Sequence, residues 1–171
     1  MKYRLLKQDR MRYSGGGRMP RFQIYFRKYQ ESQGYLKFIY KILYKVFADY
    51  SHIEISRDSM IGGGLYIGHA YCITINPDSI IGMNCNIHKG ITIGQENRGL
   101  RKGTPIIGNN VWIGINATVV GNIHVGDDVL IAPNTYVNQD VPDHSIVFGN
   151  PCIIKNRKNA TVDYINHCVE L

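Results

Sequence analysis

A histidine in the stretch LYIGHAYCITI, residues 65–75, is the first side chain in this sequence that could do chemistry. His69 lies between two small residues, Gly68 and Ala70, and isoleucines typical of a buried strand stand on either side of them. An imidazole has an ordinary pKa of about 6.5, so it can accept a proton from a reacting group near neutral pH. The alternative is an exposed histidine without a catalytic role. The choice depends on the direction in which the backbone turns this side chain.

Basic residues are concentrated at the N-terminus. Residues 1–45 contain twelve Lys or Arg and two acidic residues, whereas residues 46–171 contain eight and eleven, so the net charge of +7 belongs to the first segment. A basic arm of this kind could contact nucleic acid, an anionic membrane surface or an anionic substrate, or it could be a solvated tail and helix face. We expect no nucleic-acid partner, and a possible peripheral membrane contact through residues 1–45.

The cysteines and the apolar runs bear on the compartment. The sequence contains no CxxC pair and no His at zinc-finger spacing from a Cys, which predicts reduced thiols and no metal site. Residues 1–20 lack the apolar core of a signal peptide, and no apolar run approaches the roughly 20 residues needed to span a bilayer. We therefore expect a cytoplasmic protein, at the inner face of the membrane if the arm binds lipid.

A repeat of six residues begins at Ile55. Ile or Val recurs every six positions, with one step of eight from Ile73 to Ile81 and one of fourteen from Ile93 to Ile107. The thirteen positions are Ile55, Ile61, Ile67, Ile73, Ile81, Ile87, Ile93, Ile107, Ile113, Val119, Val125, Ile131 and Val137. Gly often follows, and Asn or Asp often comes two residues later; these residues tolerate left-handed turns. A period of six is typical of a hexapeptide-repeat β-helix.

The repeat predicts the fold class and the domains. Three repeats form one triangular coil, so we expect an all-β solenoid, a left-handed parallel β-helix with a short N-terminal helical segment. Residues 1–52 are predicted as a basic arm and amphipathic helix, 53–141 as the β-helix, and 142–171 as a C-terminal cap and tail. The fourteen-residue step predicts an excursion loop at 95–105. Because Ile67 and Ile73 point inward on this grid, His69 is predicted to point outward.

The segment before the repeat has its own pattern. Lys37, Lys41 and Lys45 are spaced four apart, which places them on one face of a predicted helix at 35–50. This helix could cover the first coil, as the ends of a solenoid require, or lie on a membrane surface. A shorter helix is predicted within 20–33, and residues 1–20 are predicted as a flexible lead-in.

Two stretches of the repeat resemble a known family. IGNNVWIGINATVVGNIHVGDDVLIAPNTYV, followed by VPDHSIVFGNPCIIK, resembles the hexapeptide acyltransferases. IEISRDSMIGGGLYIGHAYCITI, with NIHKGITIG, resembles their serine-acetyltransferase branch, which includes many O-acetyltransferases of capsule and exopolysaccharide pathways. The resemblance covers residues 53–155 and keeps both long steps. It implies a homotrimer with acetyl-CoA in the clefts between subunits and direct transfer of the acetyl group to a hydroxyl.

The resemblance also implies catalytic residues. The family's Asp-His-Ala motif matches the GHA of this chain, which makes His69 the general base. The family's acidic partner lies fifteen residues earlier, where this chain has Glu54. A carboxylate there would orient the imidazole and stabilise its charged form. His88 is the rival base, but no carboxylate is obviously placed for it.

The positions for acetyl-CoA follow from the register of the coils. Pantetheine is narrow and lies against backbone, so it needs small or flat residues at successive coils. Trp112 either packs at the trimer interface or flanks the cleft. The predicted cofactor-binding residues are Gly94, Gly114, Ile115, Ala132 and Pro133, with Lys155 near the nucleotide phosphates.

The acceptor is predicted from departures within the resemblance. The serine enzymes carry Asp at the position of Gly68, and an Arg-His pair at Gly103 and Thr104. Without these partners the charges of serine would be costly to bind. We therefore expect a sugar hydroxyl in capsule, exopolysaccharide or O-antigen biosynthesis, free or linked to a nucleotide or lipid, with Arg98, Arg101 and Thr104 contacting it. The alternatives are serine O-acetylation, N-acetylation of an amino sugar, a non-catalytic scaffold, and a zinc enzyme of the γ-carbonic-anhydrase type, which would need three histidine ligands where only His69 and His88 are near.

Overall fold

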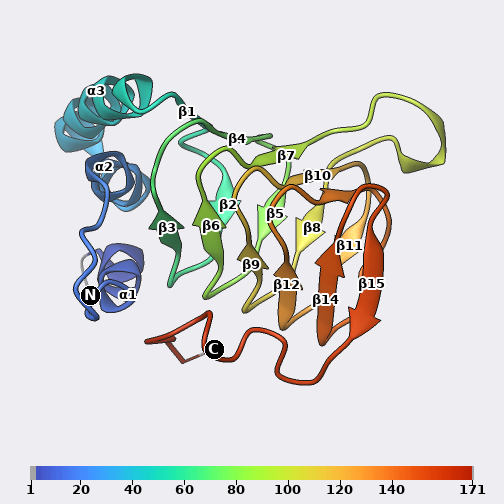
Figure 1. The fold of residues 1–171 in the computed structure, drawn as a ribbon. Helices are drawn as coiled ribbons and strands as arrows, with labels where there is room; N and C mark the ends of the chain where they lie inside the picture. The colour runs from blue at the N-terminus through green and yellow to red at the C-terminus, as the bar shows by residue number, and fades with distance from the viewer. Residues whose placement is uncertain (1–2, 171) are drawn as a thin grey trace.

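The computed structural model describes residues 3–170 and forms a parallel β-helix of about five turns with a helical segment at its N-terminal end (Figure 1). The predicted fold class, a left-handed parallel β-helix with a short helical segment, is confirmed. Each full turn contributes one short strand to each of three sheets, and strands pair with their equivalents in the next turn. The excursion loop and the chain ends lie outside this regular stack.

The strands are distributed over the three sheets in a fixed rotation. The first sheet contains β1 (Ile53–Ile55), β4 (Ile73–Ile75), β7 (Thr92–Gly94), β10 (Thr118–Val120) and β13 (Tyr136–Val137). The second contains β2 (Met60–Ile61), β5 (Ile80–Ile81), β8 (Ile106–Ile107) and β11 (His124–Val125). The third contains β3 (Tyr66–Gly68), β6 (Asn86–His88), β9 (Trp112–Ile113), β12 (Val129–Ile131), β14 (Ser145–Phe148) and β15 (Ile153–Asn156).

The buried core follows the predicted repeat with one correction. All thirteen grid positions are buried, and none is more than 6% exposed. However, Ile55 pairs with Ile75 and Ile75 with Ile93, while Ile73 stacks on Ile53. The eight-residue step therefore runs from Ile67 to Ile75 and not from Ile73 to Ile81. Both isoleucines of β4 point inward, which hid the true register, and the two additional residues fall at the corner that contains His69.

Three helices precede the β-helix: α1 (Arg4–Met11), α2 (Arg21–Gln30) and α3 (Gly34–Tyr50). Helices α2 and α3 cover the first coil, where Phe22, Phe26 and Tyr44 join its core. The helix predicted at 35–50 is confirmed within one residue. The prediction of a flexible lead-in at 1–20 is wrong, because α1 is a helix and Asp9 on it is completely buried.

A buried ion pair attaches these helices to the β-helix. Arg27 of α2 donates a 2.8 Å hydrogen bond from Nε to Oδ2 of Asp9, and both side chains are 0% exposed. Arg27 also donates to the carbonyls of Ile61 and Gly62, while the backbone N–H of Leu65 donates to Asp9. The first coil has no preceding coil to pair with, so these side chains satisfy backbone groups that would otherwise be buried without partners.

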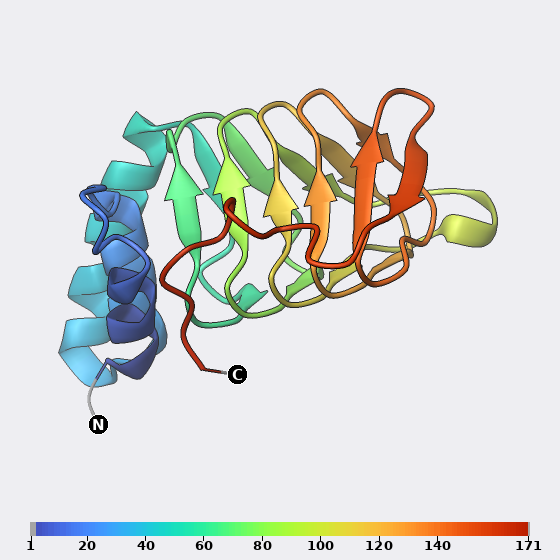
Figure 2. The same cartoon turned by 60° about the horizontal axis from the view of Figure 1, so that its bottom comes forward.

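The C-terminal segment both closes the far end and returns along the side. Strand β15 pairs antiparallel with β14 at the last coil, and the chain then runs back toward the N-terminal helices (Figure 2). Asn84 exchanges two 2.9 Å hydrogen bonds with the backbone of Val169, and Arg12 donates to the carbonyl of Asn166 at 2.7 Å. The tail therefore joins α1 to the first coils.

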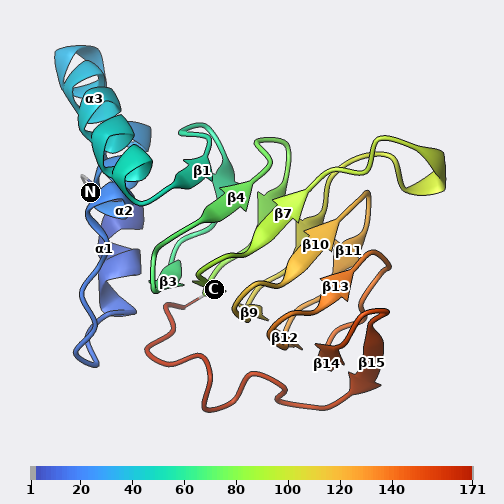
Figure 3. The same ribbon diagram turned by 45° about the horizontal axis from the view of Figure 1, so that its top comes forward.

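The predicted excursion loop leaves the prism between β7 and β8 (Figure 3). Glu96 and Gly103 pair through two backbone hydrogen bonds at its base, and a short 3-10 helix, Gly99–Arg101, forms its tip. Leu100 at the tip is fully exposed. Within residues 3–170, no helix has the length and apolarity required to cross a membrane.

Candidate active site

His69 is held outward by an unusual backbone conformation. Its φ is 54°, in the left-handed region, where asparagine, aspartate and histidine are the commonest residues after glycine. The side chain is exposed, whereas Ile67 two residues earlier is buried in the prism. The predicted outward direction of His69 is therefore what the structure shows.

This corner is two residues longer than its equivalents. In later coils the turn between the third and first sheets has one left-handed residue, Gly90 or Asn116, and the corresponding residue of the first coil is Cys72. Backbone hydrogen bonds establish this register. The N–H of Asn116 donates to the carbonyl of Lys89, the residue just before Gly90. In the same way the N–H of Gly90 donates to the carbonyl of Tyr71, the residue just before Cys72. His69 and Ala70 are therefore the added pair. The insertion moves the imidazole away from the regular surface of the prism.

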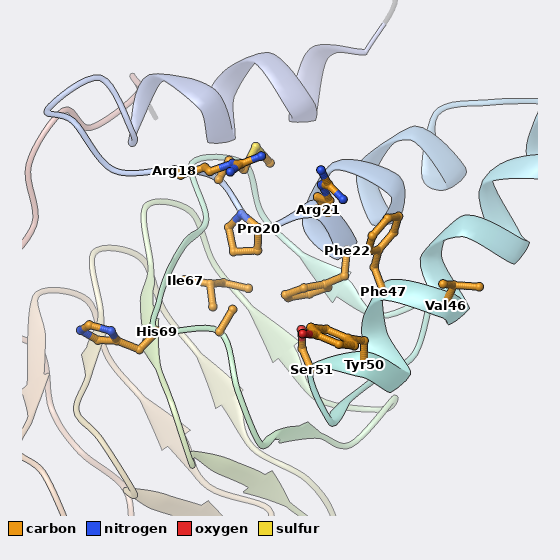
Figure 4. A pocket seen from close by; sticks show the side chains of 12 residues that line it. Arg18, Pro20, Arg21, Phe22, Val46, Phe47, Tyr50, Ser51, Ile67 and His69 are labelled. Atoms are coloured by element: carbon orange, nitrogen blue, oxygen red, sulfur yellow. The ribbon is translucent and has the colours of Figure 1, made fainter.

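His69 lies in a pocket of about 680 Å³ between the helices and the first coil (Figure 4). The walls are mainly apolar; among the described residues that line the pocket, Arg18 and Arg21 are the arginines, and there is no lysine, aspartate or glutamate. Figure 4 shows His69 on one side of the pocket and both arginines on another. The lining residues are Arg18, Met19, Pro20, Arg21, Phe22, Val46, Phe47, Tyr50, Ser51, Ile67, His69 and Ala70.

Glu54 lies one coil below His69, as expected, but the two side chains are not in contact. It lies on β1, and its Oε2 accepts a hydrogen bond from Thr74 Oγ1 at 3.4 Å. It lines a second pocket, of about 510 Å³, with Thr74 and Gly94. Within the described residues no hydrogen bond or ion pair joins Glu54 to His69. The single chain therefore does not form the predicted pair.

Gly68 has a structural reason to be glycine. It pairs with His88 across β3 and β6, and a Cβ at Gly68 would lie 2.6 Å from Nδ1 of His88. The His88 ring packs on Trp112 with centroids 4.8 Å apart, and Trp112 in turn contacts Tyr164 of the tail. An aspartate at position 68 would collide with this ring where it now lies.

His88 is a half-buried histidine one coil from the candidate base. Its Nε2 is buried without a hydrogen-bond partner among the described residues. Burial, with a smaller contribution from the charge of His69, lowers the pKa of His88.

The predicted cofactor residues at the corners line one edge of the prism. Gly114 and Ile115 stand one coil before Ala132 and Pro133, because Ile113 pairs with Ile131. A Cβ on Gly114 would approach the backbone nitrogen of Pro133 to 2.6 Å, so this corner requires glycine. These corners join the third sheet to the first, and so does the corner of His69. The structure thus aligns them with the histidine along one edge.

The other two predicted cofactor residues lie elsewhere. Gly94 ends β7 on the first sheet and lines the pocket of Glu54. Lys155 is exposed on β15 at the far end of the β-helix, with its Nζ 5.6 Å from the centroid of the Phe148 ring. Neither residue is on the edge that His69 shares.

The predicted acceptor residues are not near His69 in one chain. Arg98 and Arg101 line a pocket of about 480 Å³ at the base of the excursion loop. That loop joins the first sheet to the second, which is a different edge of the prism. Thr104 donates a 3.1 Å hydrogen bond to the carbonyl of Asp78, a contact within the fold.

Sequence reasoning missed Arg18 and Arg21 as members of the pocket. Arg18 lies in the segment 1–20, which was predicted to be a flexible lead-in, and Arg21 is the first residue of α2, within the helix predicted at 20–33. Their only signal was the basic character of residues 1–45, which does not single out two positions.

The comparisons define the class of protein. Residues 104–139 match the family model described as bacterial transferase hexapeptide (six repeats). The β-helix of this chain thus has the repeats of the hexapeptide-repeat transferase family.

More particular relatives are serine acetyltransferases. The chain is 34% identical to the serine acetyltransferase of Synechococcus elongatus over 115 residues, which is 67% of this chain and 47% of the relative. It is 38% identical to that of Staphylococcus aureus strain N315 over 102 residues, covering 60% and 48%. The chain thus spans about half the length of these relatives. The serine acetyltransferase structure from Brucella abortus shares the fold, with a TM-score of 0.70 at 24% identity over 92% of this chain and 70% of that one.

These relatives correct the predicted acceptor. The prediction of a sugar hydroxyl in polysaccharide biosynthesis is wrong, because the curated relatives named here and the solved structure are serine acetyltransferases. The physical reason is that packing and backbone conformation require glycine at positions 68 and 103, on which the prediction of a sugar acceptor rested. Gly68 makes room for His88, and Gly103 has a φ of 136° with a virtual Cβ 3.0 Å from Asn122. Their lack of charged side chains therefore carries no information about the acceptor.

Proposed function

We propose that this chain is an acetyl-CoA-dependent O-acetyltransferase whose acceptor is the hydroxyl of serine, with His69 as general base. The observation that carries the proposal is the enlarged corner. His69 stands on the added pair of residues, beside a pocket, on the same edge of the prism as the corners of Gly114 and Ala132. The names of the relatives support serine as the acceptor.

The reaction needs one proton carrier. Nε2 or Nδ1 of His69 accepts the hydroxyl proton as the serine oxygen attacks the carbonyl carbon of the thioester. The tetrahedral intermediate then collapses, the carbon–sulfur bond breaks, and the proton passes from the imidazolium to the departing thiolate. The products are O-acetylserine and coenzyme A, and the histidine is regenerated neutral. Such general-base assistance contributes about 10²–10⁴-fold to rate.

Glu54 is proposed as the group that stabilises the imidazolium. Among the described residues, its carboxylate accepts a hydrogen bond only from the hydroxyl of Thr74, at 3.4 Å. Such a weak contact leaves it free to turn toward His69 when the ligands bind, since catalytic hydrogen bonds are often long before then.

Acetyl-CoA is proposed to lie along the corner edge from Pro133 toward His69. Ile115 and Ala132 would flank pantetheine, and Lys155 near the last coil would meet the phosphates. The support is the alignment of these corners with the histidine. Gly94 is kept as a cofactor contact only through its place beside Glu54.

A homotrimer is proposed as the working assembly. The excursion loop projects from the prism with Leu100 fully exposed, and Arg98 and Arg101 are on a different edge from His69. A neighbouring copy would give the apolar tip a surface to cover and bring the arginines to another chain's cleft. Light scattering should give three times the chain mass of 19.4 kDa; a monomer would contradict the shared cleft.

A peripheral membrane contact of α3 is also proposed. Its outer face exposes Tyr35, Phe38, Ile42 and Val46, with Lys41 and Lys45 exposed beside them. An apolar face bordered by lysines is the pattern of helices that lie on anionic bilayers. Sedimentation with vesicles should show binding that depends on anionic lipid; equal binding to neutral vesicles, or none, would overturn it.

The acceptor is tested with a panel of hydroxyl compounds. The protein is incubated with acetyl-CoA labelled in the acetyl group and with serine, threonine, homoserine, glucose or glucosamine, and products are identified by mass spectrometry. We expect labelled O-acetylserine to dominate. Labelling of a sugar with none of serine would refute the proposed acceptor, and hydrolysis of acetyl-CoA alone would refute the transfer reaction.

A further inference from the structure

The pocket between the helices and the first coil has an apolar interior. Its volume of about 680 Å³ lies within the range of about 300–1,000 Å³ that is typical of ligand pockets. Met19, Phe22 and Ile67 line it and are buried. Figure 4 shows Phe22, Ile67 and Tyr50 around one space, and the ring of His69 directed away from that space. Such walls favour a hydrocarbon chain over a polar solute, which would lose its water there without gaining hydrogen bonds.

The pocket opens on the outer face of α3. Val46 and Tyr50 line it, although they are 56% and 84% exposed. They continue a row of exposed apolar side chains, Phe38 and Ile42, at steps of four residues along the same helix. The helix face proposed above to lie on a bilayer is therefore continuous with the mouth of the pocket. A hydrocarbon chain that leaves the bilayer through this mouth stays against apolar surface.

Positive charge borders the same pocket. Arg18 and Arg21 line it and are exposed, and no aspartate or glutamate is among the described residues that do so. Within residues 3–170 neither guanidinium group makes a hydrogen bond; that of Arg21 lies over the ring of Phe47, with its Cζ 5.4 Å from the centroid. Their N–H donors are thus available to a ligand. Two such groups without a carboxylate beside them select an anionic ligand.

We propose that this pocket binds the hydrocarbon chain of an anionic membrane amphiphile, whose carboxylate or phosphate contacts Arg18 and Arg21. The source is the bilayer, because the mouth lies on the apolar face of α3. This proposal rests on the proposed membrane contact of α3 and deepens it, since the helix would then hold one lipid chain in addition to lying on the surface. The role of His69 in acetyl transfer is separate, because its ring is directed away from the apolar space.

The first test uses a monomeric amphiphile, so that binding to a bilayer does not contribute. Dodecanoate, kept below its micelle concentration, is titrated into the full chain in a calorimeter. We expect one site per chain, with an affinity that rises from octanoate to dodecanoate by up to about fourfold per methylene. Dodecyltrimethylammonium has the same chain with the opposite charge and should bind at least about tenfold more weakly. Equal binding of the two would overturn the proposal.

A matched pair of variants separates the pocket from the helix face. Val46→Asp places a carboxylate in the mouth, whereas Ile42→Asp places one a turn earlier on the same exposed face, outside the pocket. Both should weaken sedimentation with vesicles of phosphatidylglycerol and phosphatidylcholine in equal parts. Only Val46→Asp should weaken the binding of dodecanoate, by at least about tenfold. If both variants weaken it equally, the pocket is not the site and the proposal is wrong.

A second pair of variants tests the arginines. Arg18→Gln/Arg21→Gln should weaken the binding of dodecanoate by about tenfold or more, as expected for the loss of hydrogen bonds to a charged group. Arg4→Gln/Arg10→Gln also loses two exposed positive charges near the N-terminus but none from the pocket, and it should bind dodecanoate as the wild type does. Wild-type affinity in the pocket variant would show that the arginines do not select the ligand.

The last experiment identifies the source of the chain and the alternative occupant. Vesicles that contain phosphatidylglycerol with a photoreactive acyl chain should label peptides containing Phe47 or Tyr50. If dodecanoate binds but these peptides are not labelled, the ligand comes from solution and the proposed source is wrong. If dodecanoate does not bind while the vesicles do, the proposal fails and the membrane contact of α3 stands; if neither binds, both fail. Self-association that both Asp variants abolish, without binding of dodecanoate, would show that a second copy covers this face and would refute the proposal.

Discussion

The β-helix and the N-terminal helices bury their interiors by different means. In the β-helix, Ile87, Ile113 and Ile131 stack on one another across successive coils, and each has the same surroundings as the next. In the helical region the equivalent centre is one ion pair, Asp9 with Arg27, whose hydrogen bonds reach backbone 34 to 56 residues away. The difference is between a contact repeated many times and a contact made once. Repeated contacts tolerate the loss of one member better than a single buried ion pair does.

The largest expected loss of stability comes from breaking that pair. Arg27→Met leaves the carboxylate of Asp9 buried without its partner, which typically costs about 3–5 kcal/mol. The double variant Asp9→Leu/Arg27→Met removes both charges and should recover much of the loss. Urea unfolding measures the free energies, and hydrogen exchange should show that the first coil opens before the last. A single variant as stable as the wild type would show that the pair does not hold the helices.

Truncation within the β-helix should cost somewhat less and should be uniform. Ile113→Ala deletes a buried side chain and should cost about 2–5 kcal/mol, whereas Ile113→Val should cost about 0.5–1.5 kcal/mol. Ile87→Ala and Ile131→Ala occupy equivalent places, so their losses of unfolding free energy should fall in the same range of about 2–5 kcal/mol. Widely different values would contradict the equivalence of the coils.

The same contrast explains what the sequence could predict. The thirteen buried positions were evident because identical surroundings impose the same residue types every six positions. The register of β4 was not evident from the sequence, because Ile73 and Ile75 are both buried and either of them fits the six-residue pattern. Only the hydrogen bonds of the corner place the two extra residues at His69 and Ala70.

The candidate site, too, could be predicted only where it follows the repeat. The outward direction of His69 followed from the repeat. The packing of His88 against Gly68 depends on neighbours one coil apart, and the place of Arg18 and Arg21 depends on how a non-repeating segment folds back. Such contacts leave no periodic signal, which is why glycines set by packing were misinterpreted as evidence about the acceptor.

The smallest expected effect is the dependence of the stability of the C-terminal tail on pH. Burial of Asp128 acts to raise its pKa, but the hydrogen bonds from His144, Thr161 and Ala160 outweigh it, so the folded pKa is below the ordinary value. A carboxyl group with a lowered folded pKa stabilises the fold above its unfolded pKa of about 3.9, and the contribution is lost as the pH falls through the folded value.

The tail should therefore loosen in acid before the β-helix does. Hydrogen exchange of the amides of Ala160 and Thr161, corrected for the intrinsic rate, should lose protection below about pH 4. In Asp128→Asn the free energy of opening at these two amides should already be lower at neutral pH, by about 1–3 kcal/mol, and it should change little further in acid. Protection in the wild type that is independent of pH would show that this carboxylate does not anchor the tail.

The most direct test of the whole account is the initial rate of O-acetylserine formation by the wild type and by His69→Ala, each shown by circular dichroism to be folded. If the histidine on the enlarged corner is the general base, the variant should lose about 10²–10⁴-fold in kcat while its KM for acetyl-CoA changes little. A His69→Ala variant that acetylates serine at the wild-type rate would contradict the account.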